Sequence, residues 1–541
     1  MSVPIALDTK GHTQPPPDTF EEKDDEEKAL PSPTSKASIL PWAHYTPPST
    51  YESAHRWDPE FTWTDDEERK LYRRLDLRVT LFACICFGAL CLDRSNIGNA
   101  TSDNFLKDLH MTTADYNLGQ TIFYISFLLA EIPSQLVSKK LGSDVWIPIQ
   151  MMAWSAVTLG QRWLVGRSGF FATRALLGLF EGGFIADTVL YLSYYFTAAE
   201  LTIRLSWFYV ALTTTGIVGS FLAAGLLQLC HHTSWTGWQF LFLIEGILTF
   251  LIGAFAFFYL PPGPTQTAGG FLGVRGNGWF TEHEEKIIVN KVLRDDPTKS
   301  DMHNREGLSL LQIWRAFADW DLLPMYLVGF LFNMPIATVT QYFSLTLKSL
   351  GYTTFQTNML QIPYQVLHIA NNLTLSYTSR RVRERFLIGS IGSTCLLVLF
   401  TALVTIPDST SKWAKWALLS LIMGAPFCHP IMVSTISANS GSVRTRTVSS
   451  AVYNAAGQLG TIVASNIYQP HDAPFYHRGN RALIGFVVAN LIAMWFCKAY
   501  YVWRNRQKER TWDAMSDEER ERYLANAKDL GNKSLDFRFV H

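Results

Sequence analysis

Apolar residues along this chain gather into about twelve runs, most of them near 20 residues long, with polar stretches between them. A helix needs about 20 residues to cross ~30 Å of hydrocarbon at 1.5 Å per residue. The pattern therefore predicts an all-α membrane protein with twelve transmembrane helices, six before and six after a charged insert. We place them at 77–99, 114–137, 145–163, 169–195, 204–230, 238–260, 323–347, 356–378, 386–406, 413–437, 446–468 and 481–503.

Charged residues lie mostly outside these runs and suggest the domain boundaries. We expect an N-terminal tail, a first six-helix half, a central loop, a second six-helix half and a C-terminal tail, at 1–75, 76–260, 261–321, 322–505 and 506–541. The start of the chain is rich in Pro, Asp and Glu, which is typical of disorder. It lacks the pattern of a cleavable signal peptide, so we expect the first helix to be an uncleaved anchor.

Charge distribution predicts the orientation. The basic clusters "RKLYRRLDLR", "RRVRER" and "RNRQKER" all flank one side of the predicted membrane. The positive-inside rule then makes both termini cytoplasmic, and we expect the plasma membrane. On that side, capping-box pairs predict surface helices that begin after Thr64, Thr281 and Ser516, each with Glu three residues later. Lys plus Arg equals Asp plus Glu at 46 each, so net charge indicates no nucleic-acid partner.

Charged residues inside the predicted helices are the first functional candidates, because each costs several kcal/mol unless it is paired or hydrated. Asp93 and Arg94 lie in the first helix, and Arg174 and Glu181 in the fourth. Arg94 and Arg174 each lie about five residues, or ~8 Å, from the outer surface, and Glu181 projects two turns deeper from the face of Arg174. We expect the four to converge on one water-filled site; mutual neutralisation between helices is the alternative.

Other polar residues suggest a hydrated central cavity. They repeat at helical spacing on one face of the second, seventh, eighth and eleventh helices, and four such faces indicate a shared cavity, whereas a single one indicates hydrogen bonding between helices. The candidate cavity residues are Gln120, Tyr124, Asn333, Gln341, Gln361, Gln365, His368, Asn454 and Gln458. His368 is either a hydrogen-bonded wall residue or a direct contact for substrate or protons.

Four further ionisable residues lie in the predicted helices. Glu131 and Asp187 lie nearer the cytoplasmic end and suggest gating or packing. His429 stands between prolines that break the helix, so we expect a structural role. Glu245 lies in the outer half of the sixth helix, and the sequence assigns it no role.

An enzyme is not expected. The chain has no Gly-rich phosphate loop, no nucleophile elbow and no metal-ligand cluster. The seven cysteines lack the spacing of a zinc or redox site and suit apolar packing. We therefore expect no cofactor and no bound metal.

The motifs resemble a known family. Six plus six helices around a charged loop resemble the major facilitator superfamily, whose two pseudo-symmetric halves rock around a midplane site. "LDRSNIGNA", "FATRALLGLFEGGF", "WQFLFLIEGILT" and "YLPPGP" resemble its anion:cation symporter family. "EIPSQLVSKKLG" and "WFTEHEEKIIVNKVLRDDPTK" are similar to the fungal allantoate permease group, whereas the superfamily motif after the second helix is degenerate.

The resemblance implies that Asp93 and Glu181 take up protons and that Arg94 helps to hold the substrate anion. We expect a monomeric importer of a small organic anion, a carboxylate or a sulfonate, by proton symport through alternating access in a lipid bilayer. Two alternatives stay open: an uncoupled facilitator or exchanger of the same fold, and a nutrient sensor that does not transport. Allantoate, vitamins, amino-acid-like anions and sulfonates are the implied substrates.

Overall fold

The computed structural model describes residues 46–48, 51–228, 235–270, 273, 275–295, 318–440, 443–473, 475–516, 518–520, 523 and 531–541. The chain separates into a unit at 1–45, which lies outside these residues, and a unit over 46–541. The disorder expected of the N-terminal tail therefore falls mostly outside the described part of the chain.

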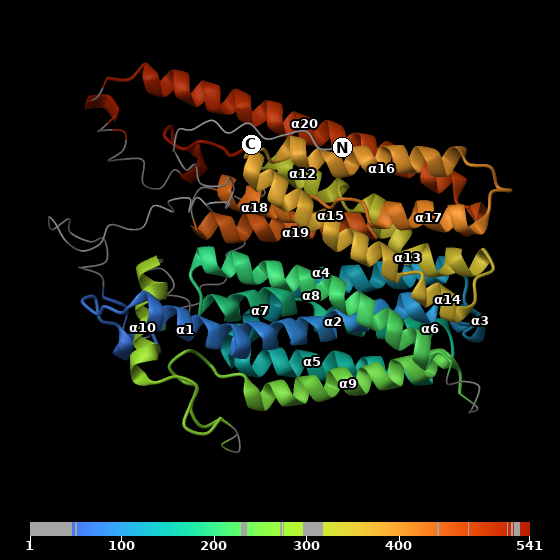
Figure 1. The fold of residues 1–541 in the computed structure, drawn as a ribbon, viewed down its shortest axis with the longest axis horizontal. Coiled ribbons are helices and arrows are strands. Elements are labelled where there is room, and N and C mark those ends of the chain that lie inside the picture. The colour runs from blue at the N-terminus through green and yellow to red at the C-terminus, as the bar shows by residue number, and fades with distance from the viewer. Residues whose placement is uncertain are drawn as a thin grey trace, which may run out of the picture. The chain divides into compact units, whose positions relative to one another are not determined.

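Helices occur at each of the twelve predicted positions within the described residues, and Figure 1 shows them as two side-by-side groups. The first group contains α2 (Leu81–Ala100), α4 (Thr113–Leu141), α5 (Ser143–Gly160), α6 (Arg167–Glu181), α7 (Phe184–Ser193), α8 (Ala198–Leu226) and α9 (Gly237–Tyr259). The second contains α12 (Leu323–Leu331), α13 (Met334–Ser349), α15 (Ile362–Val382), α16 (Phe386–Thr405), α17 (Lys412–Met423), α18 (His429–Asn439), α19 (Val443–Ala464) and α20 (His477–Asp513).

Shorter elements mark the two ends of the groups. We call the end at which α2 begins the basal end, and the end at which it finishes the apical end. The basal end carries α1 (Asp65–Leu75) and α10 (Glu282–Asp295), whereas α3 (Phe105–Asp108), η3 (Gln161–Trp163) and α14 (Thr354–Met359) lie at the apical end (Figure 1).

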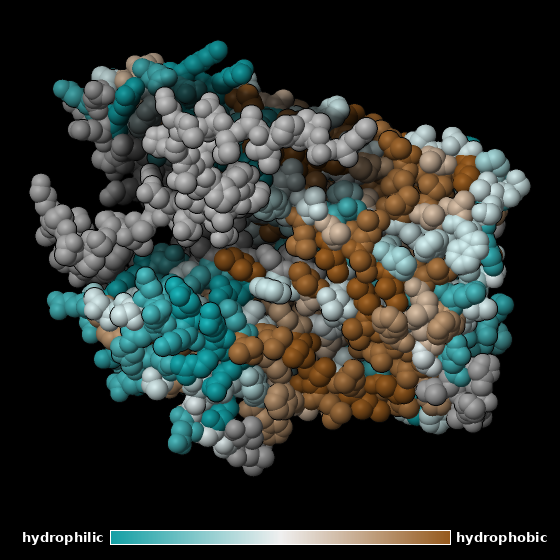
Figure 2. All heavy atoms as spheres, in the orientation of Figure 1, coloured by the Kyte–Doolittle hydropathy of each residue, from teal (hydrophilic) through white to brown (hydrophobic). Residues whose placement is uncertain are grey.

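Six helical segments of the described chain are long and apolar enough to cross a membrane: Asp65–Ala100, Arg167–Ser193, Gly237–Tyr259, Leu323–Ser349, Phe386–Thr405 and His477–Asp513. Figure 2 shows hydrophobic atoms in a broad band between hydrophilic ends. Large apolar side chains such as Leu129, Val398 and Ile492 are exposed on the helices. Apolar side chains on an outer surface of this kind are suited to lipid contact.

Several membrane helices are interrupted, and the periodicity of the sequence did not predict most of these breaks. The fourth pass breaks at Gly182 and Gly183, directly after Glu181, and Gly183 has a φ of +91° that favours glycine. A Cβ on Gly178 would lie 2.3 Å from the carbonyl oxygen of Phe123, so only glycine lets α6 approach α4 this closely. These glycines place Glu181 at a helix end against its neighbour.

The tenth pass breaks between α17 and α18, as the prolines beside His429 predicted. Side chains of α15 satisfy the freed backbone: Asn371 Nδ2 donates to the Gly424 carbonyl at 2.7 Å, and the Phe427 amide donates to Asn372 Oδ1 at 2.8 Å. The His429 ring stacks on Phe332, with centroids 5.1 Å apart. Backbone without a helical partner survives at membrane depth only where other protein groups satisfy it.

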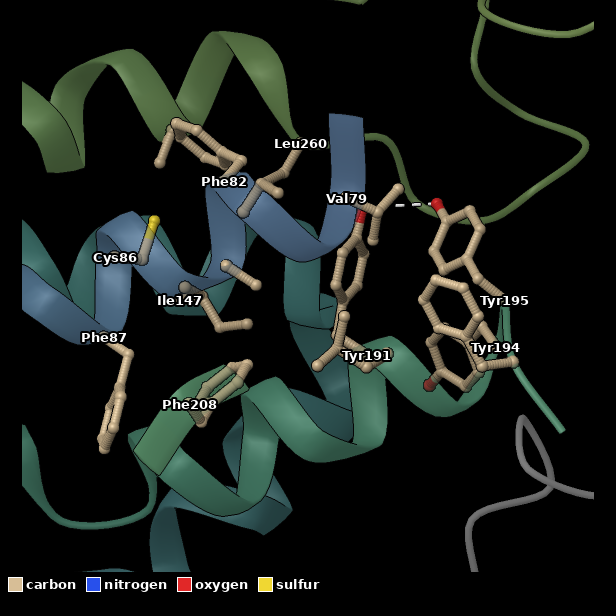
Figure 3. Packing of buried hydrophobic residues seen from close by; sticks show 14 of the residues in the cluster. Val79, Phe82, Cys86, Phe87, Ile147, Tyr191, Tyr194, Tyr195, Phe208 and Leu260 are labelled. Atoms are coloured by element: carbon tan, nitrogen blue, oxygen red, sulfur yellow. Dashed lines mark hydrogen bonds between the residues drawn. The ribbon is translucent and has the colours of Figure 1, made fainter. Parts of the chain in front are cut away.

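Aromatic and aliphatic side chains fill the basal half of the first group (Figure 3). Val79, Phe82 and Cys86 of the first pass face Ile147 of α5, and Cys86 is a small buried packing residue, as expected. The hydroxyls of Tyr191 and Tyr195 lie 3.2 Å apart. This core fixes α2 against α5, α7 and α9.

A basal clamp of residues 51–76 and α10 covers the first group. Both helices begin at the predicted capping boxes, at Thr64 and Thr281. Arg56 Nε binds Glu285 Oε2 at 2.9 Å, and Lys291 of α10 binds both Glu68 and Glu200. Bracing by these surface helices, as the sequence suggested, is therefore present in the structure. At Ser516 the third box forms, but most of its predicted helix lies outside the described residues.

A C-terminal strap of residues 531–541 lies against the basal end of the second group. Lys508 Nζ donates to the carbonyls of Asn532, Ser534 and Phe537. Asn439 and Asn505 each donate to and accept from the strap backbone, so two amide side chains hold it as an extended peptide.

Candidate functional site

A buried ion pair between α2 and α6 forms the centre of the site. Arg94 Nε donates to Glu181 Oε2 at 2.7 Å. The Glu181 side chain is 1% exposed, whereas that of Arg94 is 28% exposed. Arg94 Nη2 is buried and has no hydrogen-bond partner among the described residues. The guanidinium therefore retains donors that an incoming anion could use.

Arg174 is the second guanidinium of the site. It is 2% exposed, and its Nη2 donates to Gln161 Oε1 at 2.7 Å, while its Nε has no partner in the described chain. The Phe123 ring lies 5.8 Å from the Arg94 guanidinium and 5.9 Å from that of Arg174. Both cations thus share one aromatic ring, which stabilises them at a depth where charge is costly.

Asp93 points away from the ion pair because successive helical residues are about 100° apart. It is 3% exposed, and Trp154 Nε1 of α5 donates to its Oδ2 at 2.9 Å. Asn96 Nδ2 lies 3.4 Å from its Oδ1. The four predicted charges thus occupy one helix group, with the Asp93 carboxyl bonded to Trp154 of α5 and Arg94 bonded to Glu181 of α6.

Sequence reasoning missed Trp154 and Gln161. A buried indole N–H needs an acceptor, and a buried amide beside a cation supplies one. Trp154 lies in an apolar run and Gln161 at the end of that run, so the only available signal was that each carries a polar atom in a predicted membrane helix.

The predicted polar residues form contacts between helices at several levels. Gln341 Nε2 donates to Ser465 Oγ at 3.0 Å, and Asn333 Nδ2 lies 3.4 Å from Thr461 Oγ1. Gln120 Nε2 donates to the Tyr116 hydroxyl at 3.0 Å. These bonds lie within a group and match the alternative reading in which a polar face serves inter-helix hydrogen bonding.

The rest of the predicted set is placed as follows. Tyr124 is half-buried, with its ring 5.2 Å from that of Phe123. His368 is half-buried, 5.5 Å from the Phe427 ring. Asn454 is exposed and Gln458 half-buried on α19.

The two helix groups are joined at the apical end. Gln361 Nε2 lies 3.3 Å from Asn99 Oδ1, and Gln365 Nε2 donates to Ser220 Oγ at 3.2 Å. Further bonds between the groups connect Asn358 with Ser102, Thr354 with Ser102, Asn117 with Tyr342 and Tyr468, Tyr116 with Gln341, and Asn466 with Thr121. All of the bonds named here lie in the apical part of the described helices.

The weaker candidates fall into two kinds. Asp187 Oδ2 accepts from Ser134 Oγ at 3.0 Å, and Trp146 and Gln150 also donate to that serine oxygen, so Asp187 packs α7 against α4 and α5. Glu245 is fully buried, and neither carboxyl oxygen has a partner among the described residues.

The amino-acid sequence matches a known protein family and is similar to named relatives. The Major Facilitator Superfamily profile matches residues 83–465. The chain is 45% identical over 500 residues to Uncharacterized transporter YIL166C of Saccharomyces cerevisiae, covering 92% of each chain. It is 30% identical to the MFS-type transporter efuF of Hormonema carpetanum, covering 81% of this chain and 86% of that one.

Solved structures show the same fold at low sequence identity. The xylose transporter XylE from E. coli, in a partially occluded inward-open conformation, aligns with a TM-score of 0.58 and 16% identity, over 77% of this chain and 97% of that one. A bacterial homologue of the human lysosomal transporter Spinster aligns with a TM-score of 0.54 and 12% identity, over 81% and 97%.

Proposed function

Because the chain belongs to the Major Facilitator Superfamily, as a multi-pass membrane transporter and not an enzyme, we propose that it imports a small organic anion together with protons. The observation that carries this proposal is the Arg94–Glu181 pair, a cation and an acid in direct contact inside the membrane. In such a pair, Arg94 can exchange Glu181 for the anion of a bound substrate.

Protonation of Glu181 is the switch in this mechanism. While Glu181 is ionised, it occupies Arg94. A proton on Glu181 removes that charge and frees the guanidinium for a carboxylate or sulfonate, whose planar or multi-oxygen geometry suits Arg. The bound anion then replaces the lost charge, so the loaded site stays electrically balanced. A site with only one of the two ligands leaves a buried charge uncompensated, which opposes movement across the membrane.

Arg174 and Asp93 assist this switch, one through its charge and the other as a second acid. Arg174 donates to the neutral amide of Gln161 and not to an acid, so its positive charge stays available to favour anion entry. Asp93 is the second proton-accepting acid, as the resemblance to the anion:cation symporter family suggests. In the second group, His368 and Gln458 are half-buried on α15 and α19 and are proposed to contact the neutral part of the substrate.

The conformation fits an inward-facing transporter. The basic flanks of the helices support a cytoplasmic basal end at the plasma membrane. The groups are bonded to each other at the apical end, which faces outward in this orientation. Substrate would then leave on the cytoplasmic side after the groups rock around the site.

An uptake screen tests the substrate class. Cells expressing the protein are offered radiolabelled allantoate, nicotinate, pantothenate and sulfonates at acidic and neutral pH, with and without a protonophore. We expect one carboxylate or sulfonate to accumulate at acidic pH and to lose accumulation when the gradient collapses. Accumulation that the protonophore does not change would instead identify an uncoupled exchanger.

Substitution of Glu181 tests the switch. Glu181→Gln should reduce proton-driven accumulation by about 100-fold, because the position no longer titrates, and leave substrate exchange within a few-fold of wild type. Glu509→Gln is the control, since Glu509 is an exposed acid of α20 outside the site. Normal pH-dependent accumulation by Glu181→Gln would reject the mechanism.

A further inference from the structure

One amide side chain sets a common level for three helices around the site. Gln361, directly before α15, donates through Nε2 to Asn99 Oδ1 of α2 at 3.3 Å, and the same nitrogen lies 3.3 Å from Ser344 Oγ of α13. Depths on α2, α13 and α15 can therefore be counted from this bridge at about 1.5 Å per residue. The bridge is part of the apical closure, so the positions on its basal side lie below the closed end.

On this scale Arg94 lies between two polar side chains of the second group. Arg94 is five residues, or ~8 Å, to the basal side of the bridge on α2. Gln341 is three residues, or ~5 Å, to the same side on α13, and His368 is seven residues, or ~10 Å, on α15. The depths of the two second-group residues therefore bracket that of the Arg94 guanidinium.

Tyr124 of α4 connects Gln341 with the ion pair. Its hydroxyl interacts with the charges of Arg94 and Glu181 and with the side-chain amide of Gln341. The Phe123 ring lies 5.8 Å from the Arg94 guanidinium and 5.2 Å from the Tyr124 ring. Gln341 thus borders the same site as the ion pair, although it belongs to the other helix group.

The two helix groups offer opposite hydrogen-bonding atoms at this depth. Arg94 Nη2 is a buried donor without a partner among the described residues. Gln341 Nε2 donates to Ser465 Oγ at 3.0 Å, whereas its buried Oε1 has no partner in the described chain. The His368 ring bonds to the Met423 backbone, and its buried Nδ1 is unpartnered among those residues, which makes Nδ1 an acceptor in the neutral ring.

Permanent charges in the second group lie away from this depth. On α13, α15 and α19 they are Lys348, Arg380, Arg381, Arg444 and Arg446, each within about one turn of a helix end. A second carboxylate or sulfonate held beside Gln341 would therefore lack a cation, which is costly at membrane depth. A neutral donor group would instead satisfy the free amide oxygen.

We propose that the transported molecule is a monoanion with a hydrogen-bond donor, an N–H or O–H group, at the end opposite its carboxylate or sulfonate. Arg94 of the first group binds the charged end, and Gln341 Oε1 of the second group accepts from the donor, with His368 Nδ1 as a deeper acceptor. Gln341 is then the residue that determines specificity. This inference rests on the proposed anion transport and adds the substrate class that the site accepts.

The first test uses wild-type protein in proteoliposomes and the radiolabelled anion with the largest uptake in the screen. Propanesulfonate, hydroxypropanesulfonate and propanedisulfonate compete for that uptake, or butyrate, γ-hydroxybutyrate and glutarate if the anion is a carboxylate. We expect the hydroxyl compound to compete about 10- to 100-fold better than the other two, because they leave the buried acceptor unpaired or bring a second charge. Equal competition by the methyl-ended compound, or nicotinate as the best substrate, would overturn the inference.

The second test substitutes the acceptor. Gln341→Met keeps the side-chain length and removes Oε1, so the KM of the radiolabelled anion should rise about 10-fold and the advantage of the hydroxyl compound should shrink to about threefold or less. Asn490→Leu is the matched control. Asn490 also donates to a serine, Ser393, at 2.9 Å and has an unpartnered Oδ1 among the described residues, but it joins α20 to α16 within the second group. Equal changes in the two variants would assign the effect to packing and reject the role of Gln341.

The outcomes separate this inference from the proposed function. If no offered anion is taken up, the proposed function fails and this inference with it. If uptake occurs but does not respond to the proton gradient, symport fails, and the competition series still decides the substrate class. If proton-driven uptake does not distinguish hydroxyl from methyl ends, only this inference is overturned. Should Gln341→Met not fold, the wild-type competition series decides alone.

Discussion

The two helix groups share an architecture and differ in the chemistry of their interiors. The first holds four buried acids, Asp93, Glu181, Asp187 and Glu245, together with the buried guanidinium of Arg174 and the part-exposed guanidinium of Arg94. At the same depth the second offers neutral amides and hydroxyls, such as Gln341, Gln361 and Ser465. Its ion pairs lie at its ends instead, as between Arg504 and Asp321. Charge is thus confined to one group, where titration can control it, while the other provides neutral contacts and closure.

The largest expected effect tests the charged interior. Arg94→Lys keeps the positive charge but loses the planar fork that bonds Glu181 and the anion, so uptake should fall by about 100-fold. His368→Gln in the second group should cost only a few-fold, because it retains a neutral hydrogen-bonding side chain. Radiolabelled uptake at saturating and low substrate measures both. Comparable losses in the two variants would break the contrast between the groups.

Loss of one neutral amide bond at the apical end should have a smaller effect than loss of the Arg94 guanidinium. Asn358→Ala removes the bond to Ser102 and should cost the closed apical end about 1–2 kcal/mol, a 5- to 30-fold shift toward the outward-open state. Spin labels at the exposed positions Lys107 and Ser411 report the apical separation. Asn490→Ala is the control, since it removes a buried amide bond to Ser393 within the second group. A shift of equal size in the control would contradict a gating role for Asn358.

The two basal braces should differ in strength. Lys508→Met strands three strap carbonyls and should lower the free energy of unfolding by about 2 kcal/mol, because Lys508 is 3% exposed. Arg204→Met breaks the part-exposed pair with Asp76 in the basal clamp and should cost about 1 kcal/mol or less. Thermal unfolding in detergent compares them. An equal or larger loss for Arg204→Met would reverse the ranking.

The last prediction is a pH dependence at Asp321, which Lys533 of the strap contacts. Burial opposes ionisation of Asp321, yet hydrogen bonds from Arg504, Lys533 and Tyr500 outweigh it and lower its pKa from 3.8 to about 2. A lowered folded-state pKa stabilises the protein above the unfolded value, and this contribution disappears as the pH falls from about 4 to about 2. Asp321→Asn should flatten the thermal stability of the second group across that range. A slope equal to that of wild type would assign the loss to other groups.

The amino-acid sequence by itself determined much of this protein. Run lengths near 20 residues fixed the number and position of the membrane passes, because the bilayer thickness sets helix length. Capping residues placed the starts of α1 and α10. Helical spacing put Arg174 and Glu181 on one face, and the cost of membrane charge marked them as candidates.

Tertiary structure decided which partners those residues meet. Spacing along one helix cannot reveal that Arg94 binds Glu181 while Arg174 turns to Gln161, since each contact joins segments far apart in the chain. Helical periodicity predicted a shared cavity because it shows which way a polar side chain points but not which residue it meets. In the structure, Gln361 and Gln365 bond to the first group and help to close the apical end.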